Sequence, residues 1–162
     1  MAPSPRVAVL IDGENLSAAF APSLFEEVGK LGDASIRRVY GERRNLQGWD
    51  RIQAQYRIKS RRNGPPILRK NPTDFTLIVD AITLLHRKEC DVFCIVSSDG
   101  DFSPLAHYIR QSKKPIYGFG ESKAPKSMRE ACSKFIELNL PAPARRPAPA
   151  SPSLKRKAGS TA

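Results

Sequence analysis

The chain has 162 residues, of which 40% are hydrophobic and 27% are charged; this is the composition of an ordinary globular domain that needs neither disulfides nor a structural metal to fold. Lys and Arg number 27 against 16 Asp and Glu, and the formal net charge of +11 favours a polyanionic partner such as a nucleic acid. No stretch approaches 18 apolar residues and no signal-peptide pattern begins the chain, so we expect neither a membrane span nor secretion.

The N-terminal region predicts a strand followed by a helix. Residues 1–6 form a flexible leader, and residues 7–11, VAVLI, form a short β-branched run that is typical of a buried central strand. Apolar residues then recur at near-helical spacing over residues 16–31. Pro22 suits a first helical turn, which indicates a break just before it, and Gly32 is expected to end the helix.

The middle of the chain predicts two more strands and two helices. Residues 35–40 form a strand, and residues 49–56 form a short helix. The polar pattern of residues 57–62 would not survive full burial, so this segment is expected at an edge of the sheet. A second helix spans residues 73–86, with Thr73 as its N-cap. Its expected apolar positions are Phe75, Leu77, Ile78, Ala81, Ile82 and Leu85.

The C-terminal part continues the alternation of strands and helices. Residues 92–97, VFCIVS, form a second fully apolar strand, and residues 102–110 form a helix. Residues 115–119 form another strand, residues 127–132 a short helix, and residues 135–138 a last extended piece.

This alternation predicts an α/β protein. The expected architecture is a PIN-like Rossmannoid, three-layer α/β/α fold with a mainly parallel central sheet of about five strands. A single domain then covers residues 7–140. Residues 141–162 consist of Pro, Ala, Ser and basic residues without a buried pattern, so we expect a disordered basic tail.

Acidic residues directly follow both apolar strands. Asp12 and Glu14 come after the first of these strands, and Asp99 and Asp101 come after the second. Ligands of a doubly wound sheet bind beyond the carboxyl ends of the strands, so these acids should meet at one edge, where Asp74 joins them from a first helical turn. Each acid also precedes a helix, where an N-cap is the ordinary role, but several acids at one edge favour a metal site.

The acidic cluster points to metal-dependent chemistry. Clustered carboxylates repel one another, and a hard divalent cation such as Mg²⁺ offsets that repulsion with oxygen ligands and retained waters. Such an ion activates a water and neutralises charge on a phosphoryl group. An acidic, metal-loaded pocket in a basic protein therefore indicates phosphodiester hydrolysis, with Asp12, Asp74 and Asp99 as the expected metal ligands.

Residues 37–70 are dense in Lys and Arg and are the expected nucleic-acid contact. The candidate phosphate-binding residues are Arg43, Arg44, Arg57, Lys59, Arg61, Arg62, Arg69 and Lys70. Tyr40, Trp49 and Tyr56 lie among them and could stack on unpaired bases, although Trp49 and Tyr56 fit the core better. Asp80 lies on a different face of its helix from the site and is expected to have a structural role.

These motifs together resemble the NYN (LabA-like) domain of the PIN-like nuclease superfamily. The motifs that carry the resemblance are DGENL at residues 12–16, K-x-x-x-D at Lys70 and Asp74 with Asp80 following, and SSDGDF at residues 97–102. Residues 113–138 are similar to the family's last strand and helix, and the likeness spans about residues 5–140. Ser98 stands where Gly is common in the family, and Ser133 stands where Asp is common.

The resemblance implies a Rossmann-like sheet, one or two Mg²⁺ or Mn²⁺ ions, and RNA as the substrate. Carried onto this sequence, it gives a catalytic set of Asp12, Asn15, Asp74, Asp99 and Asp101. We therefore expect a ribonuclease, and an endonuclease rather than an exonuclease. A non-catalytic RNA-binding module on the same fold is the alternative. A Toprim-like domain is a further one, since Asp99 and Asp101 form a D-x-D after a strand and Glu14 could supply its Glu.

The cysteines bear on where the protein works. Cys90, Cys94 and Cys132 are odd in number and lack zinc-site spacing, so we expect a reduced, cytoplasmic protein. RNA is the expected partner and a membrane is not, while a homodimer is left open.

Overall fold

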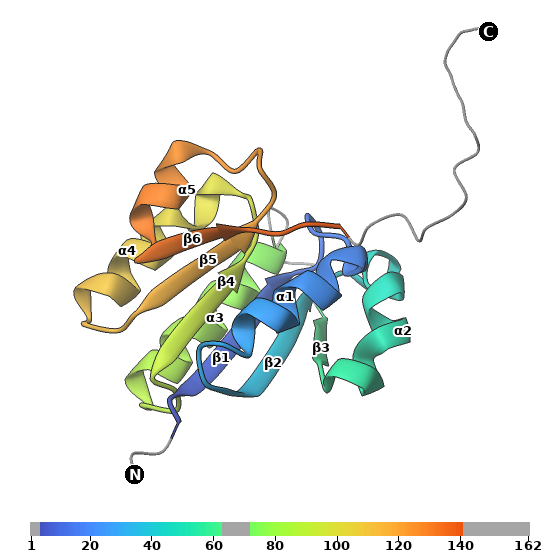
Figure 1. The fold of residues 1–162 in the computed structure, drawn as a ribbon, viewed down its shortest axis with the longest axis horizontal. Coiled ribbons are helices and arrows are strands. Elements are labelled where there is room, and N and C mark those ends of the chain that lie inside the picture. The colour runs from blue at the N-terminus through green and yellow to red at the C-terminus, as the bar shows by residue number, and fades with distance from the viewer. Residues whose placement is uncertain (1–3, 63–71, 141–162) are drawn as a thin grey trace, which may run out of the picture.

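The computed structural model describes residues 4–62 and 72–140, which form a six-stranded sheet with helices on both faces (Figure 1). Every strand pairing is parallel, and the spatial order is β3-β2-β1-β4-β5-β6. The strands are β1 (Arg6–Asp12), β2 (Asp33–Gly41), β3 (Lys59–Arg62), β4 (Val92–Val96), β5 (Ile116–Gly120) and β6 (Lys134–Glu137).

The strand order reverses direction between β1 and β4. The chain moves outward from β1 through β2 to β3 and then returns to place β4 on the other side of β1. Right-handed crossovers in such a sheet put the helices of its two halves on opposite faces. The predicted α/β architecture is therefore confirmed, with six strands instead of about five. The predicted edge segment is β3, and the extended piece at residues 135–138 belongs mostly to β6.

Helices cover both faces of the sheet, with α1 in front and α3 behind in the view of Figure 1. The first face carries α1 (Ala21–Val28) and α2 (Gln47–Tyr56), and the second carries α3 (Pro72–His86), α4 (Ser103–Gln111) and α5 (Lys126–Ala131). Three short 3-10 helices lie in the connections: η1 (Ala18–Phe20), η2 (Arg43–Asn45) and η3 (Gly100–Phe102).

The core lies on both sides of β1, which explains why its sequence is apolar without alternation. Val7, Val9 and Ile11 pack against the α1 side, whereas Ala8 and Leu10 pack against the α3 side. All five side chains are fully buried. Burial of each of the larger ones contributes about 1.5–3 kcal/mol, so β1 anchors both halves of the core.

The first helix is shorter than its periodicity predicts. Ser17 accepts a hydrogen bond from the backbone N–H of Ala19 and caps η1, and Pro22 lies in the first turn of α1, so the expected break before Pro22 is present. The helix already ends at Gly29 rather than at Gly32. Gly32 instead has a φ of 152°, and a Cβ there would come within 2.5 Å of the Pro5 carbonyl oxygen.

Helix α3 buries a narrower face than the sequence predicts. It begins one residue before Thr73, and its sheet-facing stripe runs through Leu77 and Ala81, which are fully buried. Phe75 was expected in this stripe, but 53% of its surface is exposed. The reason is geometric, because two residues along a helix correspond to a rotation of about 200°, which turns Phe75 away from Leu77.

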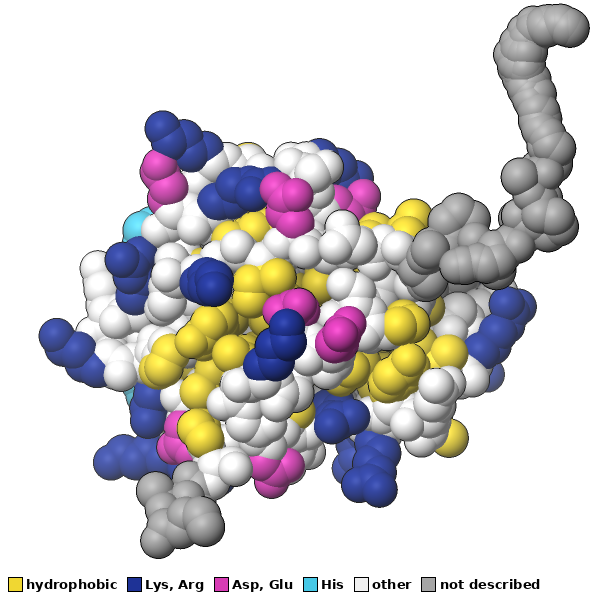
Figure 2. Space-filling view, in the orientation of Figure 1, with side chains coloured by type: hydrophobic (Ala, Val, Ile, Leu, Met, Phe, Trp, Pro, Cys, Tyr) yellow, Lys and Arg dark blue, Asp and Glu magenta, His cyan; other side chains and the backbone are white. Residues whose placement is uncertain are grey.

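The α1 face of the sheet is only half covered. Figure 2 shows hydrophobic side chains gathered over β4, β5 and β6, where no helix lies in front, and Lys and Arg side chains mostly around the rim. Tyr117 of β5 and Ile136 of β6 are partly buried here and pack against the core. Helices α1 and α2 contact the other half of the sheet, which positions the loops after β1 and β2.

Some predicted features fall outside the described residues. These are residues 1–3 of the leader and the whole tail at 141–162.

β1 begins at Arg6, which donates hydrogen bonds to Asp91. The three cysteines are buried and unpaired. No helix in residues 4–62 and 72–140 has the length and apolar character needed to cross a membrane.

Candidate metal centre

Two neighbouring central strands bring acidic residues to the same edge of the sheet. β1 ends at Asp12, and Asp99 follows β4, which pairs with β1 in parallel. Gly13 makes the turn after β1 and donates its N–H to the carbonyl oxygen of Tyr40 at 2.8 Å. A Cβ at Gly13 would lie 2.9 Å from the carbonyl oxygen of Tyr40 in β2, so glycine fits this close approach of the two backbones best.

A third carboxylate reaches this edge from α3. Asp74 lies in the first turn of that helix, and side-chain oxygens of Asp12, Asp74 and Asp99 lie within 4.8 Å of one another. Asp12 is fully buried, whereas Asp74 and Asp99 are partly buried. The structure therefore brings together the three acids that the sequence predicts as metal ligands.

The Asp12 carboxylate is held in place by three donors. Its Oδ2 accepts hydrogen bonds from Nδ2 of Asn15 at 2.7 Å and from Oγ of Ser97 at 2.8 Å. Its Oδ1 accepts one from the backbone N–H of Glu14 at 3.2 Å. The Ser97 hydroxyl also accepts a hydrogen bond from the backbone N–H of Asp99 at 3.0 Å. Ser97 thus connects the ends of β1 and β4 and fixes two of the three acids relative to each other.

The electrostatics of this group disfavour negative charge. Burial raises the pKa of Asp12 above its ordinary value, although its hydrogen bonds oppose the rise. Burial also raises the pKa of Asp74 to about 6, and the negative charges of Asp99 and Asp12 add to this shift. Perturbed carboxylates in one cluster are typical of functional sites. A cation bound here would compete with the proton on Asp74.

The other two acids of the motifs differ in position. Asp101 is exposed, and its backbone N–H donates to Oδ1 of Asp99 at 2.9 Å, so it lies beside the three acids without joining them. Glu14 points elsewhere, because its Oε2 accepts hydrogen bonds from the backbone N–H of Glu42 and from Nδ2 of Asn45. Glu14 thus lies at the predicted edge but outside the group of three acids, and a Toprim-like site would lack its Glu.

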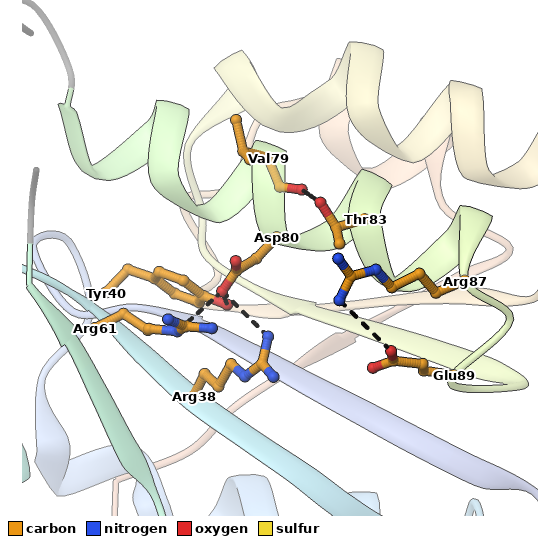
Figure 3. Close-up of polar contacts among 8 residues, drawn as sticks. All are labelled: Arg38, Tyr40, Arg61, Val79, Asp80, Thr83, Arg87 and Glu89. Atoms are coloured by element: carbon orange, nitrogen blue, oxygen red, sulfur yellow. Dashed lines mark hydrogen bonds and ion pairs between the residues drawn. The ribbon is translucent and has the colours of Figure 1, made fainter.

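Asp80 organises a second polar cluster on α3, which Figure 3 shows. Its Oδ2 accepts a hydrogen bond from the hydroxyl of Tyr40 at 2.7 Å and lies 3.2 Å from a guanidinium nitrogen of Arg38 and 3.3 Å from Nε of Arg61. Tyr40 is fully buried, so the prediction that it could stack on a base was wrong. Asp80 has the structural role expected of it, since it ties β2 and β3 to α3.

The predicted RNA-binding residues divide between the two ends of β3. Arg61 and Arg62 end this strand and pair with Tyr40 and Gly41, beside the carboxyl end of β1. Arg43 and Arg44 follow β2 in η2, also at this edge. Arg57 and Lys59 lie at the opposite, amino end of β3. Arg69 and Lys70 lie outside the described residues.

Two hollows flank the strand ends. One has a volume of about 370 Å³ and is lined by the acids Asp74 and Asp101 together with residues of α3 and the start of α4. The other, of about 620 Å³, is lined by residues 13–20 and by side chains of the η2–α2 region, including Trp49. Trp49 itself is buried, and its indole N–H donates to the carbonyl oxygen of Leu16 at 3.0 Å. A chain-like ligand therefore has space on both sides of the acids.

Hard oxygen donors make this centre suited to a divalent cation. The group offers three carboxylates, and the charges that most affect Asp74 are those of other acids. Mg²⁺ and Mn²⁺ accept such ligands while retaining waters. Asp12, Asp74 and Asp99 are the residues that would hold the ion.

The sequence interpretation missed Ser97. Removing its hydroxyl in Ser97→Ala should lower the free energy of unfolding by about 1–3 kcal/mol, because buried Asp12 loses a donor. The affinity for Mn²⁺ should fall about ten- to a hundredfold, because Asp12 and Asp99 lose their shared anchor. Thermal melting and calorimetric Mn²⁺ titration measure the two effects.

Ser98→Ala is the matched control for this experiment. Ser98 is also buried, but its hydroxyl accepts a hydrogen bond from the backbone N–H of Glu121, away from Asp12. It should cost stability and leave the Mn²⁺ affinity unchanged. Equal losses of affinity in both variants would contradict the assigned role of Ser97.

Comparisons with known proteins support the fold and identify a family. The fold is similar to that of a crystallised protein of unknown function from Vibrio parahaemolyticus, with a TM-score of 0.66 and 18% identity over 86% of this chain and 96% of that chain. At this identity the likeness shows the fold alone. No curated protein matches the chain. The family profile described as "NYN domain" matches residues 6–139, which confirms the resemblance seen in the sequence motifs.

Proposed function

This chain belongs to the NYN domain family, and from that premise we propose that it is a metal-dependent ribonuclease. Its nuclease-like fold carries an acidic group that could bind a metal. We propose further that RNA is its substrate, that Mg²⁺ or Mn²⁺ is its cofactor and that it hydrolyses phosphodiester bonds.

The observation that carries the proposal is the convergence of Asp12, Asp74 and Asp99 within 4.8 Å. The three acids come from β1, α3 and the loop after β4, and a merely structural cap would not require them to meet. Burial, and next the charges of Asp99 and Asp12, raise the pKa of Asp74, a cost of keeping it ionised that a divalent ion would offset. A metal-binding role explains both the geometry and the electrostatics.

The residues of the centre would have different roles. A bound Mg²⁺ or Mn²⁺ would supply an activated water and neutralise charge on the phosphate. Asp12 and Asp99 would hold the ion, with Asn15 and Ser97 orienting Asp12. Asp74 would complete the carboxylates around the ion or orient the attacking water.

Basic residues at the same edge would hold the RNA backbone. Arg43 and Arg44 lie after β2, and Arg61 and Arg62 end β3. Phosphate contacts by such side chains position a nucleic acid without reading its sequence. Arg57 and Lys59, at the other end of β3, would contact only a longer segment. Hollows on both sides of the centre leave room for a passing strand, which favours an endonuclease.

The decisive experiment is cleavage of RNA by the purified protein. We expect cleavage with Mg²⁺ or Mn²⁺ and none with a chelator. The products should carry 5′-phosphate and 3′-hydroxyl ends, because a water and not the 2′-hydroxyl attacks the phosphate. Parallel incubation with DNA measures the preference for RNA, and end-group analysis identifies the products.

An Asp12→Asn protein purified in the same way controls for contaminating nucleases. Cleavage that persists in this variant or with a chelator would remove the support for a metal-dependent enzyme. Cyclic 2′,3′-phosphate ends would contradict the proposed chemistry. Metal-dependent binding of RNA without any cleavage would instead indicate the non-catalytic binding module.

A further inference from the structure

Phe75 is an exposed aromatic residue directly beside the metal centre. It follows Asp74 in the first turn of α3, and 53% of its surface is exposed. Leaving so large an apolar ring in water gives up the gain that burial would provide. The ring therefore lies where a partner could cover it, one residue from a predicted metal ligand.

The ring borders an open hollow that combines apolar and acidic side chains. Phe75 and Ile78 of α3 and Pro104 of α4 supply apolar wall to the hollow of about 370 Å³, and Asp74 and Asp101 lie at the same hollow. Its volume lies at the lower end of the range for sites that hold one small molecule. The hollow thus joins an apolar surface to the acidic group within a single space.

We infer that this hollow holds one unpaired nucleobase of the substrate, stacked on Phe75, next to the phosphate that is cleaved. The inference rests on the proposed function, since it assigns a subsite to the same centre. A nucleobase is flat, uncharged and apolar on its faces, and stacking on an aromatic ring favours any base. Its charged phosphate lies within the same nucleotide, which matches a hollow with an acidic, metal-binding side.

The kind of ligand that would fill the hollow is indicated by the position of the hollow beside the candidate metal centre. A ligand that covers Phe75 here also approaches Asp74 and Asp101, so an acidic peptide would be repelled. The bases of a duplex are already stacked on one another and are not free to enter. The subsite therefore predicts a preference for single-stranded over double-stranded RNA.

The test measures stacking without relying on cleavage. The probe is a short oligouridine that carries one 2-aminopurine, whose fluorescence falls when the base stacks, and Ca²⁺ replaces Mg²⁺ so that binding is followed on intact RNA. We expect the wild-type protein to quench the probe. Phe75→Ala should bind it about tenfold more weakly and lose the quenching, whereas Phe75→Trp should restore both.

Val79→Ala is the matched control, because Val79 lies one turn further along α3 and is 59% exposed. It should leave binding and quenching unchanged, and melting curves verify that all variants are folded.

If wild-type protein cleaves RNA and Phe75→Ala binds and quenches like it, the inference is wrong and the proposed function stands. If the wild-type protein neither binds nor cleaves RNA, the proposed function itself fails. If Phe75→Ala and Val79→Ala both alter the oligomeric state in size-exclusion chromatography while quenching persists, the outer face of α3 is a contact with a second copy, and the inference is overturned.

Discussion

Replacing Asp74 by Asn is expected to reduce RNA cleavage more than a hundredfold while making the metal-free protein more stable at about pH 8. The loss of cleavage follows from removing one of three carboxylates at the centre. The gain in stability follows from removing a charge that burial and the neighbouring acids disfavour. A stabilising contact made by the ionised carboxylate would have the opposite effect, since its loss would lower stability at about pH 8.

The direction of the stability change depends on pH. The pKa of Asp74 is about 6 in the folded protein, above its ordinary value. From about pH 4 to about pH 6 the unfolded chain ionises this group more readily, so the free energy of unfolding falls as the pH rises. Allowing for solvent screening at this partly exposed group, Asp74→Asn should recover about 1–2 kcal/mol at about pH 8, or roughly 3–6 °C in melting temperature. Little difference should remain at about pH 4.

Asp91→Asn provides a control of opposite sign. The pKa of Asp91 is lowered to about 2 by hydrogen bonds from Arg6, at the amino edge of the sheet. The ionised Asp91 therefore adds to the free energy of unfolding above the ordinary pKa of an aspartate, and this stabilisation is lost as the pH falls towards 2. Asp91→Asn should accordingly be less stable than the wild type at about pH 8. Cleavage should be unaffected. A lower melting temperature for metal-free Asp74→Asn at about pH 8 would show that Asp74 has a structural role.

Saturating Mn²⁺ or Mg²⁺ is expected to stabilise the wild-type protein strongly. An ion at a hundred times its dissociation constant, bound only by the folded state, adds about 2.7 kcal/mol. This corresponds to a rise of roughly 5–10 °C in melting temperature. The rise should be smaller at about pH 5 than at about pH 8, because protons compete for Asp74 below its pKa of about 6.

Melting curves at constant ionic strength, with Na⁺ replacing the divalent ion, isolate specific binding from general screening. The Asp74→Asn protein should show a much smaller rise. An equal rise in both proteins would mean that the ion binds elsewhere, for example at surface acids.

Much of the fold follows from local sequence patterns. The apolar runs that became β1 and β4, and the helical spacing between them, predict the alternation and therefore the parallel sheet. The first and last residues of α1 could not be predicted from the sequence. Ser17 caps a separate 3-10 turn, and Gly29 ends the helix before the apolar pattern stops. Periodicity cannot show where backbone hydrogen bonds end.

The part of the candidate site that lies at the ends of strands could be predicted from the sequence. Asp12 and Asp99 directly follow two apolar strands, and a parallel sheet brings such positions together. The hydrogen bonds that hold the Glu14 carboxylate away from the other acids could not be predicted. Its partners, Glu42 and Asn45, belong to the loop after another strand. The hydroxyl of Ser97 carried one usable signal, which is its place immediately after β4.

Aromatic residues were the least predictable. Tyr40 looked like a base-stacking residue, but its ring is buried and its hydroxyl bonds to Asp80. Phe75 looked like a core residue, but it faces outward. Whether an aromatic ring is buried depends on the rotation of its helix or strand relative to the sheet, and a single sequence constrains that rotation only loosely.

The pairing of β1 with β4 has a consequence for the newly made protein. Parallel strands cannot pair through a tight hairpin, and the described residues between β1 and β4 form three α-helices, two 3-10 helices and two other strands. Synthesis runs from the N-terminus, so a chain that has emerged only through α3 carries Asp12 and Asp74 without Asp99. The complete acidic group exists only after β4 has been released and inserted beside β1. A partly made chain that ends before β4 therefore lacks Asp99, and any metal-dependent activity of this centre requires a strand from the second half of the chain.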